Sequence, residues 1–413
     1  MTTNVRVNAG RLWSSLMEMA AIGATPKGGV RRIGLSEEDR QGRNLFRRWC
    51  DARGYAVRVD PLGNMFARRP GAESGLKPVL VGSHLDSQPT GGKFDGAFGV
   101  LAALEAMRTL DDLGVATRRP IEIVNWTNEE GAVFRPMVGS EVFTGAMPLE
   151  SAYELREPSG ETMKARLEAI GYKGERPLDP SDVHCYFEAH IEQGPILELE
   201  RKTIGVVTGG IGLMWYKVTL TGVEAHAGPT PMRVRRDALM GAAEVALAVR
   251  EIARAHEGGR GTVGCLTPYP ASPNVIPGLV EMTVDLRHEN GAELLRMDAA
   301  FRGVVAAVAQ ENKLASEVDL TVESPPIPFH PRLVGFVRDA AEALGFSHLD
   351  IVSGAGHDAF HMARRVPTAM IFIPCENGIS HNESENATQA DCEAGCNVLL
   401  QAALRAANEA SDL

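Results

Sequence analysis

The sequence contains no long hydrophobic run, and its first residues form no apolar stretch followed by a cleavage site. A membrane-spanning helix needs about 18–20 apolar residues in a row, so neither a transmembrane segment nor a signal peptide is predicted. Basic residues are also in deficit, with 42 Lys and Arg against 53 Asp and Glu. The net charge of −11 argues against nucleic acid and against membrane surfaces as partners. We therefore expect a cytoplasmic protein.

Cysteine is sparse, and no two cysteines form a C-x-x-C pair. No disulfide framework is therefore indicated, and buried free thiols in a reducing compartment are expected. The six are Cys50, Cys185, Cys265, Cys375, Cys392 and Cys396. Internal repeats and low-complexity tracts are absent as well. With 413 residues, of which 44% are hydrophobic, the chain is large enough for two globular domains.

The range 79–96, VLVGSHLDSQPTGGKFDG, joins a short apolar run to a polar, glycine-rich loop. The apolar run predicts a buried strand, and His84 and Asp86 follow it. Because Asp86 lies two residues from His84, its carboxylate is predicted to accept the second ring N–H and fix the tautomer that a metal ligand needs. Glycines on both sides of Asp95 predict a turn that aims this carboxylate at His84.

Strands are predicted to deliver three polar loops to one edge of a sheet. The order of strand, amphipathic helix and strand over 79–126 is typical of a βαβ unit with parallel strands. Ligands of open α/β sheets bind at the carboxyl ends of the strands. Glu129 and Glu130 follow the second strand, and His190 follows a third. The predicted helices here are 8–22, 37–53 and 97–113, and the strands are 55–59, 64–67, 79–81, 120–126 and 183–189.

From about residue 213 the pattern changes to βαββαβ, the ferredoxin-like order. Its elements are predicted at 213–221, 235–256, 261–269, 279–287, 291–313 and 316–322. A proline-rich segment over 324–328 then leads back to α/β alternation, with helices at 331–345, 356–364 and 388–410 and a strand at 368–373. We expect an α/β catalytic domain, with a mixed central sheet flanked by helices, from residues 1–212 and 329–413. Residues 213–328 are expected to form an inserted α+β domain.

Five side chains at strand ends or in loops supply the set of ligands that a pair of metal ions requires. They are His84, Asp95, Glu130, His190 and His381. Adjacent residues at the end of a strand point to opposite sides, so Glu130 is assigned to the metal and Glu129 to proton transfer. Taken alone, each of these residues also fits an ordinary polar loop. Their combination favours a metal-dependent hydrolase.

Eight short motifs together carry a resemblance that extends from the first helix to the last. They are GSHLDSQPTGGKFDG (82–96), NEEG (128–131), HIEQGP (190–195), EAHAGPTPM (224–232), SPNVIPG (272–278), DLRHE (285–289), GAGHDA (354–359) and SHNE (380–383). The chain resembles the hydantoinase/carbamoylase amidases, metal-dependent hydrolases that share a fold with dinuclear zinc aminoacylases and exopeptidases. No departure from the family pattern occurs at these positions.

The resemblance implies two divalent metal ions per subunit, with Asp95 as the bridge between them and Glu129 as the general base. Zinc suits these ligands, and manganese, cobalt and nickel stay open. His190 sets the chain apart from the exopeptidases, which usually have an acidic residue there. Implied substrate contacts are Gln193, His226, Asn274, Arg287 and Gly356. The resemblance also implies a homodimer through the inserted lid domain, with His226 and Asn274 reaching the partner's site.

The chemistry of these substrate contacts is consistent with an anionic substrate. The guanidinium of Arg287 can hold a carboxylate by two hydrogen bonds, and Asn274 offers both a donor and an acceptor. His226 can donate to an oxygen that becomes negative, an oxyanion role. The plain alternatives are a surface ion pair, a turn former and a structural histidine, respectively. His357 is a further candidate, whereas His184, His256, His288, His330, His348 and His361 are taken as non-catalytic.

The favoured function is hydrolysis of the carbamoyl C–N bond of N-carbamoyl-L-amino acids to amino acid, ammonia and carbon dioxide. N-carbamoyl-β-alanine and allantoate stay open as substrates, because one methylene changes binding by only about 1–3 kcal/mol and the motifs are shared. A dipeptidase or aminoacylase, and a non-catalytic binding protein, are the more distant alternatives. Closure between the two domains is expected to complete the site.

Overall fold

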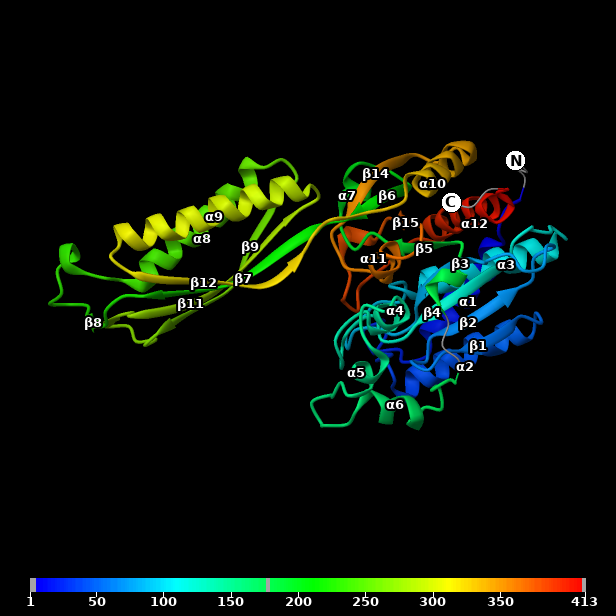
Figure 1. The fold of residues 1–413 in the computed structure, drawn as a ribbon, viewed down its shortest axis with the longest axis horizontal. Helices are drawn as coiled ribbons and strands as arrows, with labels where there is room; N and C mark the ends of the chain where they lie inside the picture. Colours follow the sequence, from blue (N-terminus) through cyan, green and yellow to red (C-terminus); the bar gives the residue numbers. More distant parts are fainter. Residues whose placement is uncertain (1–4, 176–178, 411–413) are drawn as a thin grey trace. The chain divides into compact units, whose positions relative to one another are not determined.

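The computed structural model describes residues 5–175 and 179–410. The chain divides into two compact units, each with its own hydrophobic core (Figure 1). Unit 1 consists of Met1–Gly209 and Pro328–Leu413, and unit 2 consists of Gly210–Ile327. None of the helices in the described ranges is long and apolar enough to cross a membrane.

Unit 1 is built on a mixed sheet in the order β1-β2-β4-β3-β5-β15-β6-β13, with β14 paired to β6. The central strands β4, β3, β5 and β15 are parallel neighbours, whereas β2 and β6 run antiparallel beside them. The predicted βαβ unit and mixed sheet are therefore confirmed. The strands are β1 (Ala56–Val59), β2 (Met65–Arg69), β3 (Val79–His84), β4 (Ile121–Trp126), β5 (Cys185–Ile191), β6 (Ile204–Gly210), β13 (Ile327–Pro328), β14 (His348–Ser353) and β15 (Thr368–Ile373).

Helices of unit 1 begin and end close to the predicted positions. Ser36 caps α2, because its hydroxyl accepts the backbone N–H of Asp39. The shorter helices α4 to α7 were not predicted from the sequence. The helices are α1 (Ala9–Ala20), α2 (Glu37–Asp51), α3 (Ala97–Asp112), α4 (Val138–Phe143), α5 (Leu149–Tyr153), α6 (Met163–Ala169), α7 (Ile196–Leu199), α10 (Pro331–Leu344), α11 (Asp358–Ala363) and α12 (Gln389–Asn408).

Helix α3 differs from the amphipathic helix that the sequence predicts. Its apolar side packs on the sheet, but the opposite side is buried as well, including Glu105 and Arg108. Helices α1 and α12 both pack against α3. Arg11 of α1 pairs with Glu105 at 2.7 Å, which compensates the buried charge. Buried glutamate in this helix is thus a packing feature that a hydrophobic pattern does not reveal.

Strand β5 is longer at its carboxyl end than predicted. The expected end was residue 189, but pairing with β15 continues through His190, which lies opposite Phe372, to Ile191. His190 is therefore held within the sheet and not in the following loop. In the same way His84 is the last residue of β3. Two of the candidate ligands accordingly project from rigid strand backbone, which fixes their direction better than a loop does.

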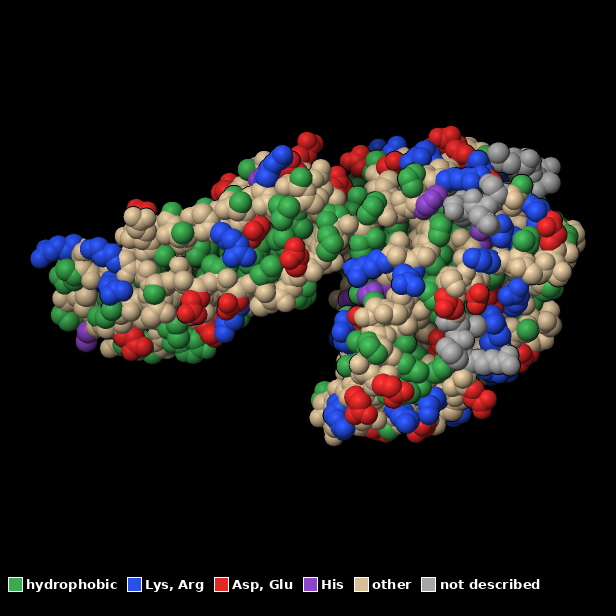
Figure 2. All heavy atoms as spheres, viewed as in Figure 1, with side chains coloured by type: hydrophobic (Ala, Val, Ile, Leu, Met, Phe, Trp, Pro, Cys, Tyr) green, Lys and Arg blue, Asp and Glu red, His purple; other side chains and the backbone are tan. Residues whose placement is uncertain are grey.

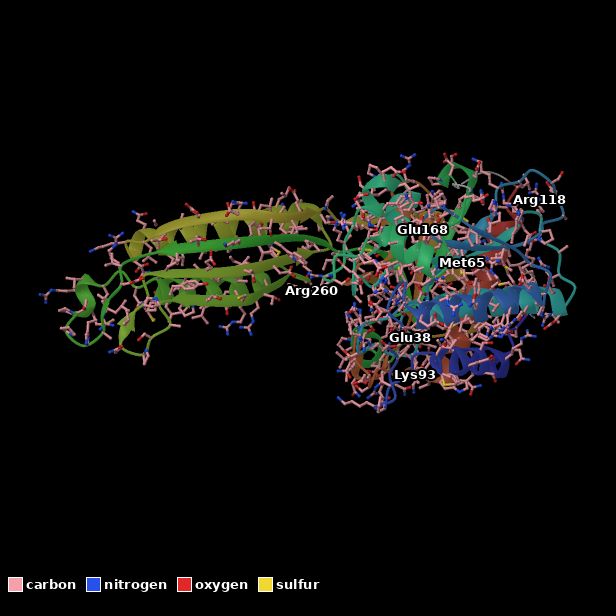
Figure 3. The ribbon with its side chains drawn as sticks, turned by 90° about the horizontal axis from the view of Figure 1, so that it is seen from below. Glu38, Met65, Lys93, Arg118, Glu168 and Arg260 are labelled. Atoms are coloured by element: carbon pink, nitrogen blue, oxygen red, sulfur yellow. The ribbon has the colours of Figure 1, made fainter. Side chains whose placement is uncertain are left out.

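Unit 2 contains a four-stranded antiparallel sheet in the order β12-β7-β11-β9. Helices α8 and α9 lie on one face of the sheet (Figures 1 and 3), where they bury Tyr216, Met297 and Phe301. Hydrophobic side chains also lie among charged ones on the surface of this unit (Figure 2). The elements are β7 (Gly212–Thr221), α8 (Ala238–Ala255), β9 (Arg260–Tyr269), β11 (Leu279–His288), α9 (Gly291–Glu311) and β12 (Ala315–Ser324), with the small pair β8 (Ala225–His226) and β10 (Val275–Ile276).

Replacing Arg43 with Met is expected to destabilise unit 1 by about 3–5 kcal/mol, since it leaves a buried carboxylate unpaired. The Arg43 guanidinium donates to Asp39 at 2.8 Å, to the carbonyl of Gly63 at 2.7 Å and to Thr127 at 3.2 Å. Arg40→Met on the same helix is the matched control, because its partner is the exposed Glu37. Urea unfolding measures both. Equal stability of the two variants would contradict the role given to the buried pair.

Candidate metal centre

The predicted ligands come together at the carboxyl ends of β3, β4 and β5. His84 ends β3, Glu129 and Glu130 follow β4, and His190 lies near the end of β5. These strands are parallel, so their carboxyl ends meet at the same edge of the sheet. The turn before α3 adds Asp95 to this edge. The convergence of loops that the sequence predicts is therefore present in unit 1.

Two groups of potential ligand atoms share one carboxylate. In the first, Asp95 Oδ1 lies 3.5 Å from His84 Nε2 and 3.1 Å from His190 Nε2. In the second, His381 Nε2 lies 3.4 Å from Asp95 Oδ2 and 3.2 Å from Glu130 Oε2. Within each group the ligand atoms lie within 4.8 Å of one another. Asp95 thus offers one oxygen to each group, an arrangement suited to two neighbouring cations.

Hydrogen bonds to backbone carbonyls fix the tautomers of the two buried histidines. His84 Nδ1 lies 3.0 Å from the carbonyl of Asp86, and His190 Nδ1 lies 2.9 Å from that of Ile191. A carbonyl only accepts, so in each neutral ring Nδ1 carries the hydrogen and Nε2 has the lone pair. Nε2 of His84 is buried and has no hydrogen-bond partner within the described ranges. A buried lone pair facing carboxylates fits a divalent cation.

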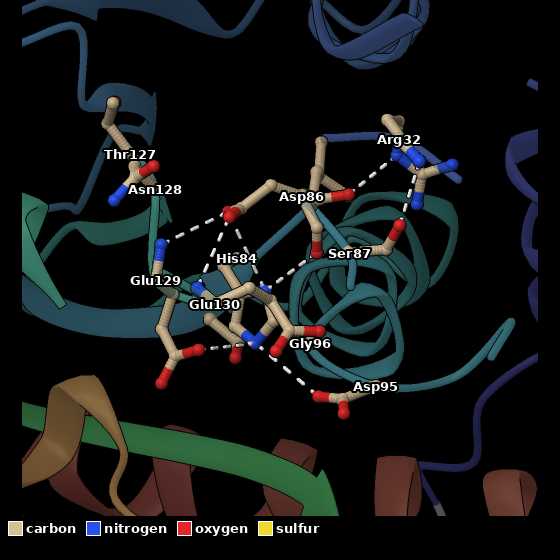
Figure 4. A network of polar contacts seen from close by, with 12 residues as sticks. Arg32, His84, Asp86, Ser87, Asp95, Gly96, Thr127, Asn128, Glu129 and Glu130 are labelled. Carbon is tan, nitrogen blue, oxygen red and sulfur yellow. Dashed lines mark hydrogen bonds and ion pairs between the residues drawn. The ribbon is translucent and has the colours of Figure 1, made fainter. Parts of the chain in front are cut away.

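The role predicted for the Asp86 carboxylate is wrong. Its backbone carbonyl orients His84, and its Oδ1 lies 3.7 Å from His84 Nδ1, too far for a hydrogen bond. The carboxylate instead accepts the backbone N–H groups of Glu129 and Glu130, each at 3.2 Å (Figure 4). Asp86 therefore connects two of the converging loops. The sequence spacing correctly predicts that Asp86 lies beside His84. It does not show whether the side-chain carboxylate or the backbone carbonyl of Asp86 accepts the hydrogen bond.

Glu129 faces the first group of ligands, with its Oε2 3.5 Å from His84 Nε2 (Figure 4). Burial raises the pKa of Glu129 well above its usual value, and the neighbouring carboxylates of Asp358, Glu130 and Asp95 act in the same direction. Burial also acts to raise the pKa of Asp95, but His190 and His84, when they carry a proton on Nε2, outweigh it and hold that pKa well below its usual value. Neighbouring acids are therefore prepared for different tasks, one to carry a proton and one to stay charged.

Backbone strain is concentrated around these residues. Four residues other than glycine have left-handed backbone angles here, with φ of 55° at Asn128, 58° at Met137, 57° at Gln193 and 54° at His381. Such conformations cost of order 1 kcal/mol or more and persist where the surrounding structure enforces them. Asn128 directly precedes Glu129. The strained backbone therefore sets the direction of the groups at the metal centre.

A cavity of about 250 Å³ opens onto the candidate ligands. Gln193 lines it and donates its amide N–H to Asp95 Oδ2 at 2.8 Å, so this predicted substrate contact also supports the shared carboxylate. Gly356 lines the cavity too, where a Cβ would lie 3.1 Å from Met137 Cε. His357 packs against His190 with ring centroids 4.5 Å apart, and burial lowers its pKa well below the usual value. It is therefore a neutral wall of the cavity.

The remaining predicted contacts lie in unit 2, and the structure separates them into two places. His226 and Asn274 are neighbours, since the N–H of Ala227 donates to the carbonyl of Asn274 at 2.9 Å. Arg287 lies near the other end of β11, eight residues from Leu279 and thus about 26 Å away along the strand. Its guanidinium donates to Asp285 at 2.8 Å. The β8–β10 pair with His226 and Asn274 directly precedes the Leu279 end of β11, so the two places lie towards opposite ends of this strand.

Comparison with known proteins identifies the family. The model of peptidase family M20/M25/M40 matches residues 80–405. The chain belongs to this family. An N-carbamoyl-L-amino-acid amidohydrolase from Rhizobium meliloti is 47% identical to it, with 98% of each chain covered. An allantoate amidohydrolase from Escherichia coli is 35% identical over 92% of this chain and 94% of its own.

Solved structures identify the branch of the M20/M25/M40 family. The crystal structure of a hydantoinase/carbamoylase family amidase from Burkholderia multivorans superposes with a TM-score of 0.95 at 52% identity, covering 98% of this chain and 99% of that one. The chain is therefore a member of the hydantoinase/carbamoylase amidases. The resemblance inferred from the eight motifs and the zinc-exopeptidase-like fold of unit 1 are confirmed.

Several polar side chains that support the predicted ligands of this M20/M25/M40 family member were not predicted from the sequence. Gln88 donates its side-chain N–H to Glu130 Oε2 and its backbone N–H to Oε1, at 2.8 and 3.1 Å. Arg32 is fully buried and donates to the carbonyl of Leu85 at 2.6 Å, behind the loop of His84. Gln88 lies inside the motif GSHLDSQPTGGKFDG (82–96), so its place near the predicted ligands could have been predicted from the sequence. Arg32 carries no local signal, because its guanidinium donates to backbone carbonyls, those of Leu85, Met19 and Ile22.

Proposed function

We propose that the protein is a metal-dependent amidohydrolase that cleaves the carbamoyl C–N bond of N-carbamoyl-L-amino acids. The observation that carries the proposal is the pair of ligand groups sharing Asp95, with the buried Glu129 beside them. The name of the Rhizobium meliloti relative favours this substrate class. Allantoate is the second candidate, since the Escherichia coli relative is named for it. N-carbamoyl-β-alanine shares the ureido group and the carboxylate, so it belongs in the same test.

The proposed ligands are His84, Asp95 and His190 for one divalent cation and Asp95, Glu130 and His381 for a second. Imidazole and carboxylate donors suit zinc, and manganese, cobalt and nickel bind the same groups. When bound, such cations polarise a carbonyl and lower the pKa of water. The carbonyl-fixed tautomers of His84 and His190 support this assignment, because they leave a lone pair on each Nε2. In His190 this lone pair accepts the backbone N–H of Gly96 at 3.2 Å.

Glu129 is proposed as the general base and acid of the reaction. It accepts a proton from the attacking water, whose oxygen forms a bond to the carbamoyl carbon. It then returns the proton to the nitrogen that leaves when the C–N bond breaks. One water is consumed for each amino acid, ammonia and carbon dioxide released. Burial supports this role, because a carboxylate whose pKa is raised by desolvation takes up and releases a proton more readily near neutral pH.

His226 and Arg287 are proposed to bind the substrate. His226 Nδ1 accepts the N–H of Gly228 at 3.1 Å, so a neutral ring carries its hydrogen on Nε2, at an exposed position. That N–H is available to an oxygen that becomes negative in the transition state. Arg287 is proposed to hold the substrate carboxylate, with Asp285 orienting its guanidinium. Asn274, beside His226, offers a further amide donor and acceptor.

We propose a homodimer in which unit 2 forms the interface. Two observations support it. His226 pairs with β10, which directly precedes the Leu279 end of β11, whereas Arg287 lies about 26 Å along β11 from Leu279, so two subunits are needed if both contact one substrate. Among the described residues, ten of the thirteen large hydrophobic side chains that are exposed belong to unit 2, the others being Leu113, Leu199 and Ile379. An excess of exposed hydrophobic side chains on one unit is consistent with an interface there.

Complementation between two inactive variants tests this dimer. When Glu129→Gln and His226→Asn chains are co-expressed in equal amounts, half of the dimers are mixed. In each mixed dimer one site has both Glu129 and a His226 supplied by the partner. Activity is expected to recover to about a quarter of the wild-type value, measured as ammonia release. If His226 acts within its own subunit, or the protein is monomeric, no recovery occurs.

The substrate class is tested by ammonia release from a panel of compounds with metal-reconstituted protein. The panel contains N-carbamoyl-L-methionine, its D enantiomer, N-carbamoyl-β-alanine, allantoate and a dipeptide, for which amine release is measured. We expect the highest kcat/KM for the L-α-carbamoyl compound. Dominant turnover of allantoate or N-carbamoyl-β-alanine would keep the chemistry and change the substrate. Turnover of the dipeptide alone would contradict the carbamoyl assignment.

A further inference from the structure

Glu385 joins two parts of the metal centre that lie far apart in the sequence. Its Oε1 accepts the backbone N–H groups of Phe94 at 3.0 Å and Asp95 at 3.1 Å. Its Oε2 accepts the hydroxyl of Ser380 at 2.9 Å. Phe94 and Asp95 belong to the turn before α3, whereas Ser380 directly precedes His381. One buried carboxylate thus connects the segment of the shared ligand with the segment of His381.

The turn is shaped to receive this carboxylate. A Cβ on Gly92 would lie 2.0 Å from Glu385 Oε1 and 2.1 Å from its carboxyl carbon, so only glycine leaves room. The backbone angle of Gly92 does not lie in the left-handed region, so space and not conformation accounts for the glycine. Glycine at position 92 therefore leaves the space that the Glu385 carboxylate occupies.

Ser380 extends the connection to the ligand side chain. Its Oγ lies 2.9 Å from Glu385 Oε2 and also 3.1 Å from Asp95 Oδ2. A serine hydroxyl carries one hydrogen, which these two carboxylates share or compete for. The amide of Gln193 donates to the same Asp95 oxygen at 2.8 Å. Ser380 and Gln193 therefore hold the carboxylate of Asp95, while Glu385 accepts its backbone N–H.

We propose that Glu385 is a positioning residue, which orients Asp95 and His381 towards each other before a cation binds. The inference rests on the proposed function, since it concerns the same ligands. Glu385 is not itself assigned as a ligand: its Oε1 already accepts two N–H groups and its Oε2 a hydroxyl, and it belongs to neither group of potential ligand atoms. A group that orients a ligand changes metal affinity about 10–100-fold when it is lost.

Three variants separate positioning from general stability. Glu385→Ala removes both acceptors and should weaken cation binding about 10–100-fold. Glu385→Gln keeps one carbonyl oxygen for the two N–H groups and should stay within a few-fold of wild type. Gly92→Ala leaves Glu385 in the chain but displaces its carboxylate, so it should resemble Glu385→Ala. Glu383→Gln is the matched control, because this carboxylate on the same loop pairs with Lys27 at 3.5 Å and, in the ranges that the structure describes, contacts none of the proposed ligands.

The readouts are the affinity and number of Zn²⁺ and Mn²⁺ ions bound by the metal-stripped full-length protein in calorimetry, and the rise in Tm that each ion produces. A positioning role predicts that Glu385→Ala and Gly92→Ala lose much of this rise, whereas Glu385→Gln and Glu383→Gln retain it. The proposal is overturned if both disruptive variants lower Tm without metal yet bind the ions as wild type does. If Glu385→Ala does not fold, Gly92→Ala decides alone. A wild-type protein that binds neither ion would instead overturn the proposed function.

Discussion

Replacement of Glu129 by Gln is expected to lower kcat by about 10²–10⁴-fold, the usual contribution of a general acid–base group, while leaving the bound metal in place. The amide has nearly the shape of the carboxylate but cannot accept a proton from water. Glu129 lies 3.5 Å from His84, yet it belongs to neither group of potential ligand atoms. Ammonia release and metal content of the same preparation measure the two effects separately.

Glu130→Gln is the matched control, since it makes the same chemical change one residue away. Glu130 Oε2 lies 3.2 Å from His381 Nε2 in the second ligand group, so this variant should lose metal and activity together. Both variants are therefore expected to lose activity, but only Glu130→Gln is expected to lose metal. A Glu129→Gln protein that keeps substantial turnover, or that loses its metal, would contradict the general-base role.

Replacement of Asp95 by Asn is expected to remove both cations, the largest effect on metal content of any single substitution. Asp95 offers Oδ1 to the group of His84 and His190 and Oδ2 to that of Glu130 and His381. An amide has only one oxygen and no charge, so it cannot serve both groups. Metal analysis after dialysis should find no bound ion, and activity should fall to background.

His381→Ala provides the comparison for Asp95→Asn, because it changes the second group alone. It should retain one ion, held by His84, Asp95 and His190, and lose the other. The Asp95 variant should also lose the rise in Tm that metal gives the wild-type protein, since a ligand stabilises the fold only by binding it. Two ions bound by Asp95→Asn with unchanged affinity would show that this carboxylate is not shared.

Much of the metal centre follows from the sequence because its parts obey simple rules of chain geometry. Parallel strands must bring His84, Glu130 and His190 to one edge of the sheet, and glycines around Asp95 must form a turn. Neither inference needs atomic detail. The burial of the second side of α3 was harder to predict from the sequence. The helices that pack against α3, α1 and α12, come from opposite ends of the chain.

The supporting contacts did not follow from the sequence, because they depend on distances of a few tenths of an ångström or on remote backbone atoms. Spacing brings Asp86 to His84 but does not decide whether carbonyl or carboxylate is the acceptor. Glu385 lies about 290 residues from the turn that it holds, and nothing near it in the sequence points there. The separation of His226 from Arg287 likewise needs the strand register of unit 2.

The most direct test of the account is ammonia release from N-carbamoyl-L-methionine by the same protein before and after removal of its metal, with bound metal counted in each state. The account predicts turnover with two divalent ions bound, loss of turnover after chelation, and recovery when ions are returned. It also predicts that Asp95→Asn does not recover under these conditions. Full turnover by the stripped wild-type protein, or recovery by Asp95→Asn, would contradict a reaction organised around the shared carboxylate.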